Sequence, residues 1–402
     1  MKKKSVIKGK TLDQPLNDSP IEVKYCTNCV TSNQRPRLTF DEKGVCSACQ
    51  YAYLKHNVID WDKREKELIK LCNRFRSKDG SYDVVVPGSG GKDSGYVAHI
   101  LKARYGMHPL SVTWAPFRYT PIGWQNFESF VDSGFDTLTC FQNGILHRKL
   151  AKIAFEYKGD AWEPFTFGQK AYAFHIALKF KIPLIFYGEN GEIEYGGSMQ
   201  NKDKPFESVT DWEKLYFKGA GIDKLIEIGL ETGLFTKEEI EPASSFYLYK
   251  VPPLEEVEKL GAEMHWMSYY RKWLPQENYY YAAEHTGFKP NPAGRSEGTY
   301  SKYASLDDQT DGFHWYLQYV KFGIGRATSD AAQEIRSGHL TREEGVSLVH
   351  RYDGEFPVFW FKAFLEYLNI TKEEFWDIMD KYRAPHLWEK KNGKWILKYK
   401  VR

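Results

Sequence analysis

The sequence contains no apolar run long enough to cross a membrane, which argues against membrane insertion. No apolar signal-peptide core follows the basic start at residues 1–4, so we expect a cytoplasmic protein. Charge of one sign is also scarce, since 56 basic and 53 acidic residues leave a formal net charge of +3. So small an excess gives no reason to expect a nucleic-acid partner. No internal repeat is apparent.

Two common nucleotide-binding motifs are missing. Gly91-Lys92 is followed by Asp93, whereas a Walker loop requires Ser or Thr there. The Rossmann fingerprint lacks its third glycine. What is present is Ser-Gly-Gly-Lys-Asp-Ser at 89–94, between a β-branched run at 84–86 and a helical pattern. A strand, a glycine turn and a helix N-terminus together form an anion site, since free N–H groups and the helix dipole converge there.

Four cysteines form two pairs, Cys26-x-x-Cys29 and Cys46-x-x-Cys49, with sixteen residues between the pairs. This spacing is typical of a zinc ribbon with four thiolate ligands, and such a site leaves no open position for catalysis. Disulfides are the competing interpretation, although a cytosolic compartment disfavours them. An iron–sulfur cluster would use the same ligands.

Strands alternate with helices through the middle of the chain, which predicts an α/β fold with a doubly wound, mostly parallel sheet. The fourth strand is followed by Gly188-Glu189-Asn190. Ligands of such sheets bind beyond the carboxyl ends of the strands, which selects the loop at Ser89, Thr113-Trp114 and Gly188. Glu189 and Asn190 could bind Mg²⁺, unless the segment is only a solvated acidic loop. The expected strands are 84–86, 108–114, 135–141 and 182–187, and the expected helices are 60–76, 125–131, 144–157 and 165–181.

From residue 251 onward the chain is helical in character and rich in aromatic residues. Lys321 and Arg326 flank two glycines there, an arrangement that suits a polyphosphate but also a solvated surface loop. We leave 198–250 unassigned, apart from a helix that a capping box starts at Thr236. The expected organisation is a flexible tail at 1–20, a zinc-ribbon-like module at 21–58, an ATP-binding domain at 59–250 and a helical carboxyl-terminal region at 251–402.

Ser-Gly-Gly-x-Asp-Ser resembles the pyrophosphate loop of the ATP pyrophosphatase superfamily, which has an adenine nucleotide alpha hydrolase-like fold. Together with the cysteine pairs, the 188–190 segment and the 321–326 segment, it resembles the N-acetyl sugar amidotransferases of bacterial surface-polysaccharide biosynthesis. The resemblance implies ATP-dependent conversion of an acetamido group, on a sugar expected to be nucleotide-linked, to acetamidino through an adenylated intermediate. It also implies separate glutaminase and cyclase-like subunits, resembling those of histidine biosynthesis, which supply ammonia.

The resemblance also implies roles for individual residues. Asp93 would position Mg²⁺, while Lys321 and Arg326 would stabilise the leaving pyrophosphate. The residues expected to contact ATP are Ser89, Gly90, Gly91, Lys92 and Ser94, with Thr113, Trp114, Gly188, Glu189 and Asn190 at the other strand ends.

Two rival functions use the same motifs. A tRNA-modifying enzyme of the thiolase or lysidine synthase type shares the loop and often zinc knuckles. A thiolase needs a sulfur-carrying cysteine, and Cys140 at the third strand is the candidate, without a partner cysteine nearby. A non-catalytic nucleotide-binding or zinc-scaffold subunit is the other rival, although the loop keeps Asp93 and both serines.

Overall fold

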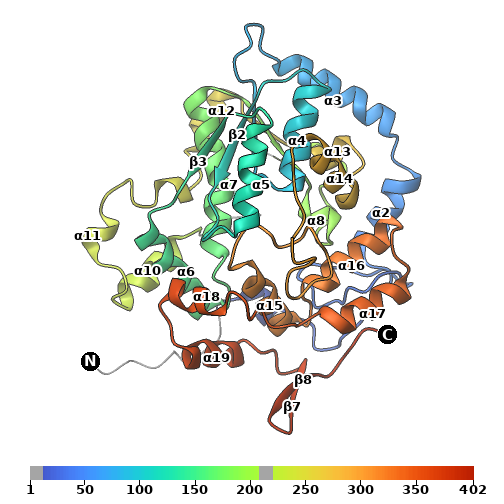
Figure 1. The fold of residues 1–402 in the computed structure, drawn as a ribbon, viewed down its shortest axis with the longest axis vertical. Helices are drawn as coiled ribbons and strands as arrows, with labels where there is room; N and C mark the ends of the chain where they lie inside the picture. Colours follow the sequence, from blue (N-terminus) through green and yellow to red (C-terminus); the bar gives the residue numbers. More distant parts are fainter. Residues whose placement is uncertain (1–11, 208–220) are drawn as a thin grey trace.

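The computed structural model describes residues 12–207 and 221–402, with a sheet at its centre (Figure 1). Within this described part, the strand order is β3-β2-β1-β4-β6-β5. All neighbouring strands are parallel except β5, which runs antiparallel to β6. The predicted α/β class with a parallel sheet is therefore confirmed. The strands are β1 (Val84–Pro87), β2 (Pro109–Trp114), β3 (Thr137–Cys140), β4 (Leu184–Tyr187), β5 (Phe206–Glu207) and β6 (Glu263–Trp266).

Helices cover both faces of the sheet because successive strand residues point to opposite sides. Val85 packs into one hydrophobic cluster, while Val84 and Val86 pack into another. The Val85 cluster takes residues from α6 (Gly144–Lys158), α7 (Glu163–Phe180), α10 (Asp223–Glu231) and α12 (Leu254–Leu260). The opposite cluster takes residues from α3 (Trp61–Phe75), α4 (Lys92–Ala103), α5 (Pro121–Asp132) and α13 (Met267–Tyr270), and α14 (Pro275–His285) packs against α4.

The expectation that 251–402 is helical is wrong in two places. Glu263–Trp266 forms β6, which pairs with β4 and extends the sheet past the expected boundary at residue 250. Two further strands, β7 (Trp388–Lys391) and β8 (Lys394–Leu397), form an antiparallel hairpin. β6 escaped prediction because it is four residues long, contains Glu263 and His265, and is stabilised mainly by its neighbours.

The carboxyl-terminal helices form two groups. α15 (Asp311–Phe322), α18 (Phe361–Leu368) and α19 (Lys372–Lys381) enclose an aromatic cluster that also contacts α6. α16 (Arg326–Ser337) packs against α17 (Arg342–Tyr352) and against α2 (Ser47–Asn57) of the cysteine module. The remaining short elements are α1 (Gln14–Asn17), α8 (Gly191–Glu194), α11 (Lys237–Ile240) and the 3-10 helix η1 (Tyr247–Tyr249).

Part of the expected tail at 1–20 is ordered against the fold. Residues 1–11 lie outside the described residues, as do 208–220. Leu12 N–H donates to Tyr157 O at 3.1 Å, and the buried Asp13 forms an ion pair with Lys321. The capping box at Thr236 is confirmed, since it begins α11.

Candidate functional site

The loop between β1 and α4 has a backbone that requires glycine. Gly90 has φ of +80°, in the left-handed region, and a Cβ there would lie 2.6 Å from Phe127 Cα. Gly91 is the N-cap of α4 and brings no capping side chain. An anion bound at the loop would be held by the first N–H groups of α4, which have no side-chain cap.

Two polar contacts shape the loop. Ser94 Oγ donates to Gly91 O at 3.1 Å, which closes the first turn of α4. Ser89 Oγ donates to Asp307 Oδ2, a residue just before α15. The loop is therefore held partly by its own residues and partly by the carboxyl-terminal region.

Lys92 and Asp93 form an ion pair at the start of α4. Asn278 Nδ2 of α14 donates to Asp93 Oδ1 at 3.2 Å, and Lys92 Nζ lies 5.6 Å from the centre of the Tyr303 ring. Asp93 is thus oriented by two neighbours. A bound cation would compete with Lys92 for its carboxylate.

Carboxyl groups with raised pKa values surround the loop. Burial, followed by the charge of Asp93, raises the pKa of Glu189 to about 7. Burial raises the pKa of Asp307 to about 6, against the Ser89 hydrogen bond that lowers it. Burial also raises the pKa of Asp308 to about 7, although this carboxylate accepts bonds from Thr310. These carboxyl groups line cavities at the loop, but among the described residues only the four cysteines bring three or more metal-ligating atoms within 4.8 Å of one another.

Two cavities meet at these residues. The larger, of about 680 Å³, contains Gly88, Ser89, Gly91 and Ser94, and its size lies within the usual range for small-molecule sites. The smaller, of about 290 Å³, contains Lys92, Tyr303, Arg326 and Asp330. The residues that line both cavities are Arg35, Asp93, Glu189, Tyr195 and Trp315.

The predicted residues at the other strand ends fall into three sets. Gly188 and Glu189 line the larger cavity, and the Tyr195 hydroxyl donates to Glu189 Oε1 at 2.7 Å. Trp114 lines a smaller cavity of about 110 Å³ that shares Gly88, Ser89 and Asp307 with the larger one. Thr113 and Asn190 are instead buried in structural roles: Thr113 Oγ1 donates to Gly88 O at 2.6 Å, and Asn190 Oδ1 accepts from Glu192 N–H as the N-cap of α8.

Lys321 and Arg326, expected to act together, lie in different surroundings. Lys321 is buried in the last turn of α15, where Nζ lies 2.5 Å from Asp13 Oδ2 and donates to Lys158 O. It lines neither cavity at the loop. Arg326 begins α16, lines the smaller cavity and lies 4.7 Å from the Trp315 ring centre. The pairing predicted from spacing is thus not formed.

Several residues of the site escaped the sequence interpretation. Asp307, Asp308 and Asp311 line a cavity of about 190 Å³ beside Lys92 and Asp93. Three acids within five residues, at the start of a helix, were the available signal. Tyr195 and Arg35 carried no such signal.

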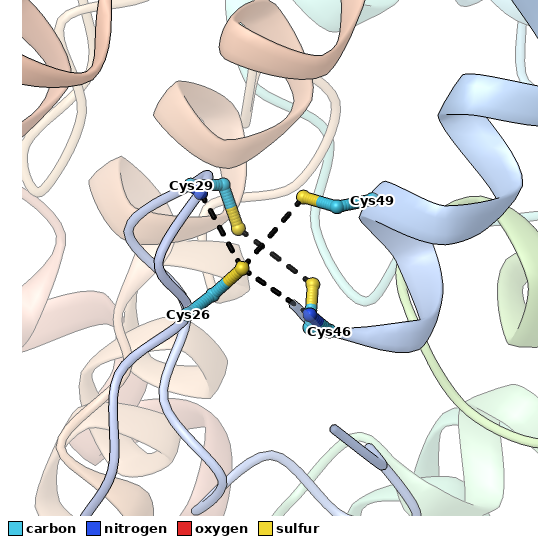
Figure 2. A group of neighbouring side chains, drawn as sticks. All are labelled: Cys26, Cys29, Cys46 and Cys49. Carbon is cyan, nitrogen blue, oxygen red and sulfur yellow. Dashed lines mark hydrogen bonds between the residues drawn. The ribbon is translucent and has the colours of Figure 1, made fainter. Parts of the chain in front are cut away.

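The four cysteines of the amino-terminal module converge on one point, as Figure 2 shows. The Sγ atoms of Cys26 and Cys49 lie 3.9 Å apart, and those of Cys29 and Cys46 lie 3.8 Å apart. Four sulfurs bonded to one zinc at about 2.3 Å lie about 3.8 Å from one another. All four cysteines are buried as free thiols. The donor set therefore fits a single zinc ion, and Arg336 of α16 donates to Cys29 Sγ at 3.8 Å.

Comparison with known proteins gives a match in the carboxyl-terminal region. Residues 297–402 match the model of the C-terminal domain of WbpG-like LPS biosynthesis proteins. This match supports a role in surface-polysaccharide biosynthesis. The matched region supplies Asp307 and Arg326, which contact or face the loop.

An uncharacterized protein of Methanocaldococcus jannaschii is 30% identical over 88 residues. These residues make up 22% of this chain and 31% of that protein. The chain thus spans about a third of the length of the curated relative that it matches. Within the two described ranges, no helix combines the length and apolar character needed to cross a bilayer.

Proposed function

We propose that this chain is an ATP-dependent amidotransferase that converts the acetamido group of a nucleotide-linked N-acetyl sugar to acetamidino. One observation carries the proposal. The glycine loop at the ligand edge of the sheet is bonded, through Ser89 and Asp307, to the region that matches an LPS biosynthesis domain. The nucleotide-binding feature and the polysaccharide-associated feature therefore form one site. The adenine nucleotide alpha hydrolase-like fold is part of the same proposal.

The chemistry requires activation of a poor leaving group. Transfer of AMP from ATP to the acetamido oxygen releases pyrophosphate; ammonia then attacks the amide carbon, and AMP departs with the oxygen. The α4 N–H groups and Ser89 would bind the pyrophosphate, and Arg326 would stabilise its charge. Asp93 would position Mg²⁺, directly or through water, and the ion would supply charge neutralisation when bound.

The nitrogen would come from ammonia made elsewhere. Burial raises the pKa of Cys72 to about 12 and that of Cys140 to about 11, so neither thiol is activated as a glutaminase nucleophile. This supports the proposal of a separate glutaminase, with a cyclase-like subunit that relays ammonia. Cys140 is equally unsuited to sulfur transfer.

The decisive experiment supplies the protein with ATP, Mg²⁺, ammonium and a panel of nucleotide-linked N-acetyl sugars. We expect AMP together with a product lighter by the difference between O and NH, detected by mass spectrometry. Asp93→Asn serves as the inactive control, with folding checked by circular dichroism. AMP formed with tRNA, and with no sugar, would overturn the proposal in favour of a tRNA-modifying enzyme.

A further inference from the structure

Arg35 extends from the four-cysteine module into the candidate site. It lies between the two cysteine pairs, yet its side chain lines both the larger and the smaller cavity beside Asp93 and Glu189. The module therefore contributes a guanidinium group to the same space as the glycine loop. A purely structural zinc module would not need to do so.

The loop that carries Arg35 is firmly held. Gln34 Nε2 donates to Pro20 O at 2.8 Å, and Gln34 Oε1 lies 2.8 Å from His386 Nε2. Leu38 packs so closely on Gly196 that a Cβ at Gly196 would overlap it. Arg35 Nε donates to Gly196 O at 3.0 Å. The position of the guanidinium is thus set before any ligand arrives.

Arg35 forms no ion pair within the described ranges; the carboxylate that acts on it electrostatically is Glu192, which is bonded to Arg37. Arg35 contacts the Gly196 carbonyl and the Tyr195 ring, whose centre lies 5.8 Å from the guanidinium carbon. Arg37, two residues further on, is by contrast ion-paired with Glu192. Burial, followed by the charge of Arg336, lowers the pKa of Arg35 to about 10.

Three other cations that face these cavities, Lys92, Arg326 and Arg37, are already in ion pairs, and Lys170 also lines the larger cavity. Lys92 is paired with Asp93, and Arg326 Nε lies 3.1 Å from Asp330 Oδ1. A half-buried cation without an ion pair gains from binding an anion, since the cavity walls screen the pair less than bulk water does. The planar guanidinium fork matches a phosphate group, to which it can donate two hydrogen bonds.

We propose that Arg35 is a phosphate-binding residue of this site, supplied by the four-cysteine module. The phosphate belongs either to ATP or to the diphosphate of the sugar substrate. Naming the second source rests on the proposed function, whereas binding of a phosphate group does not. The metal module is then part of the ligand site as well as a support for it.

The test compares Arg35→Gln with Lys24→Gln by titration calorimetry. Lys24 is exposed on the same module and pairs with Glu22, so its substitution removes the same charge away from the cavities. The probes are inorganic pyrophosphate, ATP with Mg²⁺ but without ammonium, and uridine diphosphate N-acetylglucosamine. We expect Arg35→Gln to lower the affinity for at least one probe roughly 10- to 100-fold, because a charge-assisted hydrogen bond is lost. Lys24→Gln should leave the affinity for every probe unchanged.

Weaker binding of pyrophosphate and ATP assigns Arg35 to ATP, and weaker binding of the nucleotide sugar alone assigns it to the acceptor. Arg35→Lys, which keeps the charge without the fork, should recover part of the affinity and shows that the site is folded. Affinities within threefold of the wild type for all three probes would overturn the proposal, as would a wild type that binds none of them. If no sugar yields AMP but Arg35→Gln still loses pyrophosphate, the amidotransferase function fails and the phosphate assignment stands.

Discussion

The four-cysteine cluster takes every ligand from residues 26–49, whereas the glycine loop depends on partners as distant as Asn278 and Asp307. Both are short motifs that can be recognised in the sequence. In the first, spacing alone almost fixes the chemistry. In the second, the loop provides the anion site, but the groups that orient Ser89 and Asp93 come from other parts of the fold. A local motif thus predicts a ligand better than it predicts a reaction.

The largest effect is expected at the four-cysteine cluster, whose ligands are all close in sequence. Cys46→Ser should abolish metal binding, which contributes on the order of 10 kcal/mol to small zinc modules. We expect amide hydrogen exchange to become fast through residues 25–57 while α4 stays protected. Metal analysis and exchange mass spectrometry would measure this. Unchanged exchange in the module would show that packing against α16, not metal, holds it together.

The next largest effect is expected at the glycine loop, whose partners come from distant parts of the chain. Asp93→Asn should reduce AMP release by roughly 10³-fold, about 4 kcal/mol in activation free energy, because the site loses its central carboxylate. The thermal midpoint should hardly change, since Asp93 is partly exposed. The measurement is AMP release under saturating ATP. Wild-type turnover would remove Asp93 from the proposed mechanism.

The sequence could predict what neighbours in the chain determine. Local patterns include the strand at Val84–Pro87, the glycine loop and the four cysteines. Asp60 likewise is the N-cap of α3, a position that aspartate favours. The sequence could not predict that Asp307 meets Ser89, because 218 residues separate them and only the tertiary fold joins them. β6 was missed because its pairing with β4, rather than its own composition, makes it a strand.

Lys321 and Arg326 were grouped because they are close in sequence, yet the break between two helices separates them. α15 ends at Phe322, with Gly323 as its C-cap at φ of +67°, and α16 starts after Gly325, so the two cations belong to different helices. Lys321→Met should lower the free energy of unfolding by about 3 kcal/mol, since Asp13 would be left buried without its cation. Arg326→Gln should instead lower AMP release about tenfold at nearly unchanged stability. Denaturant titration and turnover assays distinguish the two, and a loss of turnover in folded Lys321→Met would contradict the assignment.

The smallest effect is expected from the raised pKa of Glu189 in the site at the glycine loop. The pKa of Glu189 rises from 4.5 to about 7 on folding, so the folded state holds its proton across this window while the unfolded state loses it. Stability from this group is therefore present below about pH 4.5 and is lost as the pH rises towards 7. Glu189→Gln should gain about 1–3 kcal/mol over the wild type between pH 5 and pH 8. Thermal unfolding at both pH values measures this difference, and a pH-independent difference would show that Glu189 titrates normally.

The bond from Arg336 to Cys29 has a consequence for how the protein is made. Cys26, Cys29, Cys46 and Cys49 leave the ribosome long before α16, against which the module packs. At synthesis rates of roughly 5–20 residues per second, α16 is made on the order of half a minute after the cysteines, and until then it cannot cover their thiols. During this interval they are open to oxidation and to competing metals. Zinc supply and reducing conditions during translation should therefore limit the yield of correctly loaded protein more than conditions after folding.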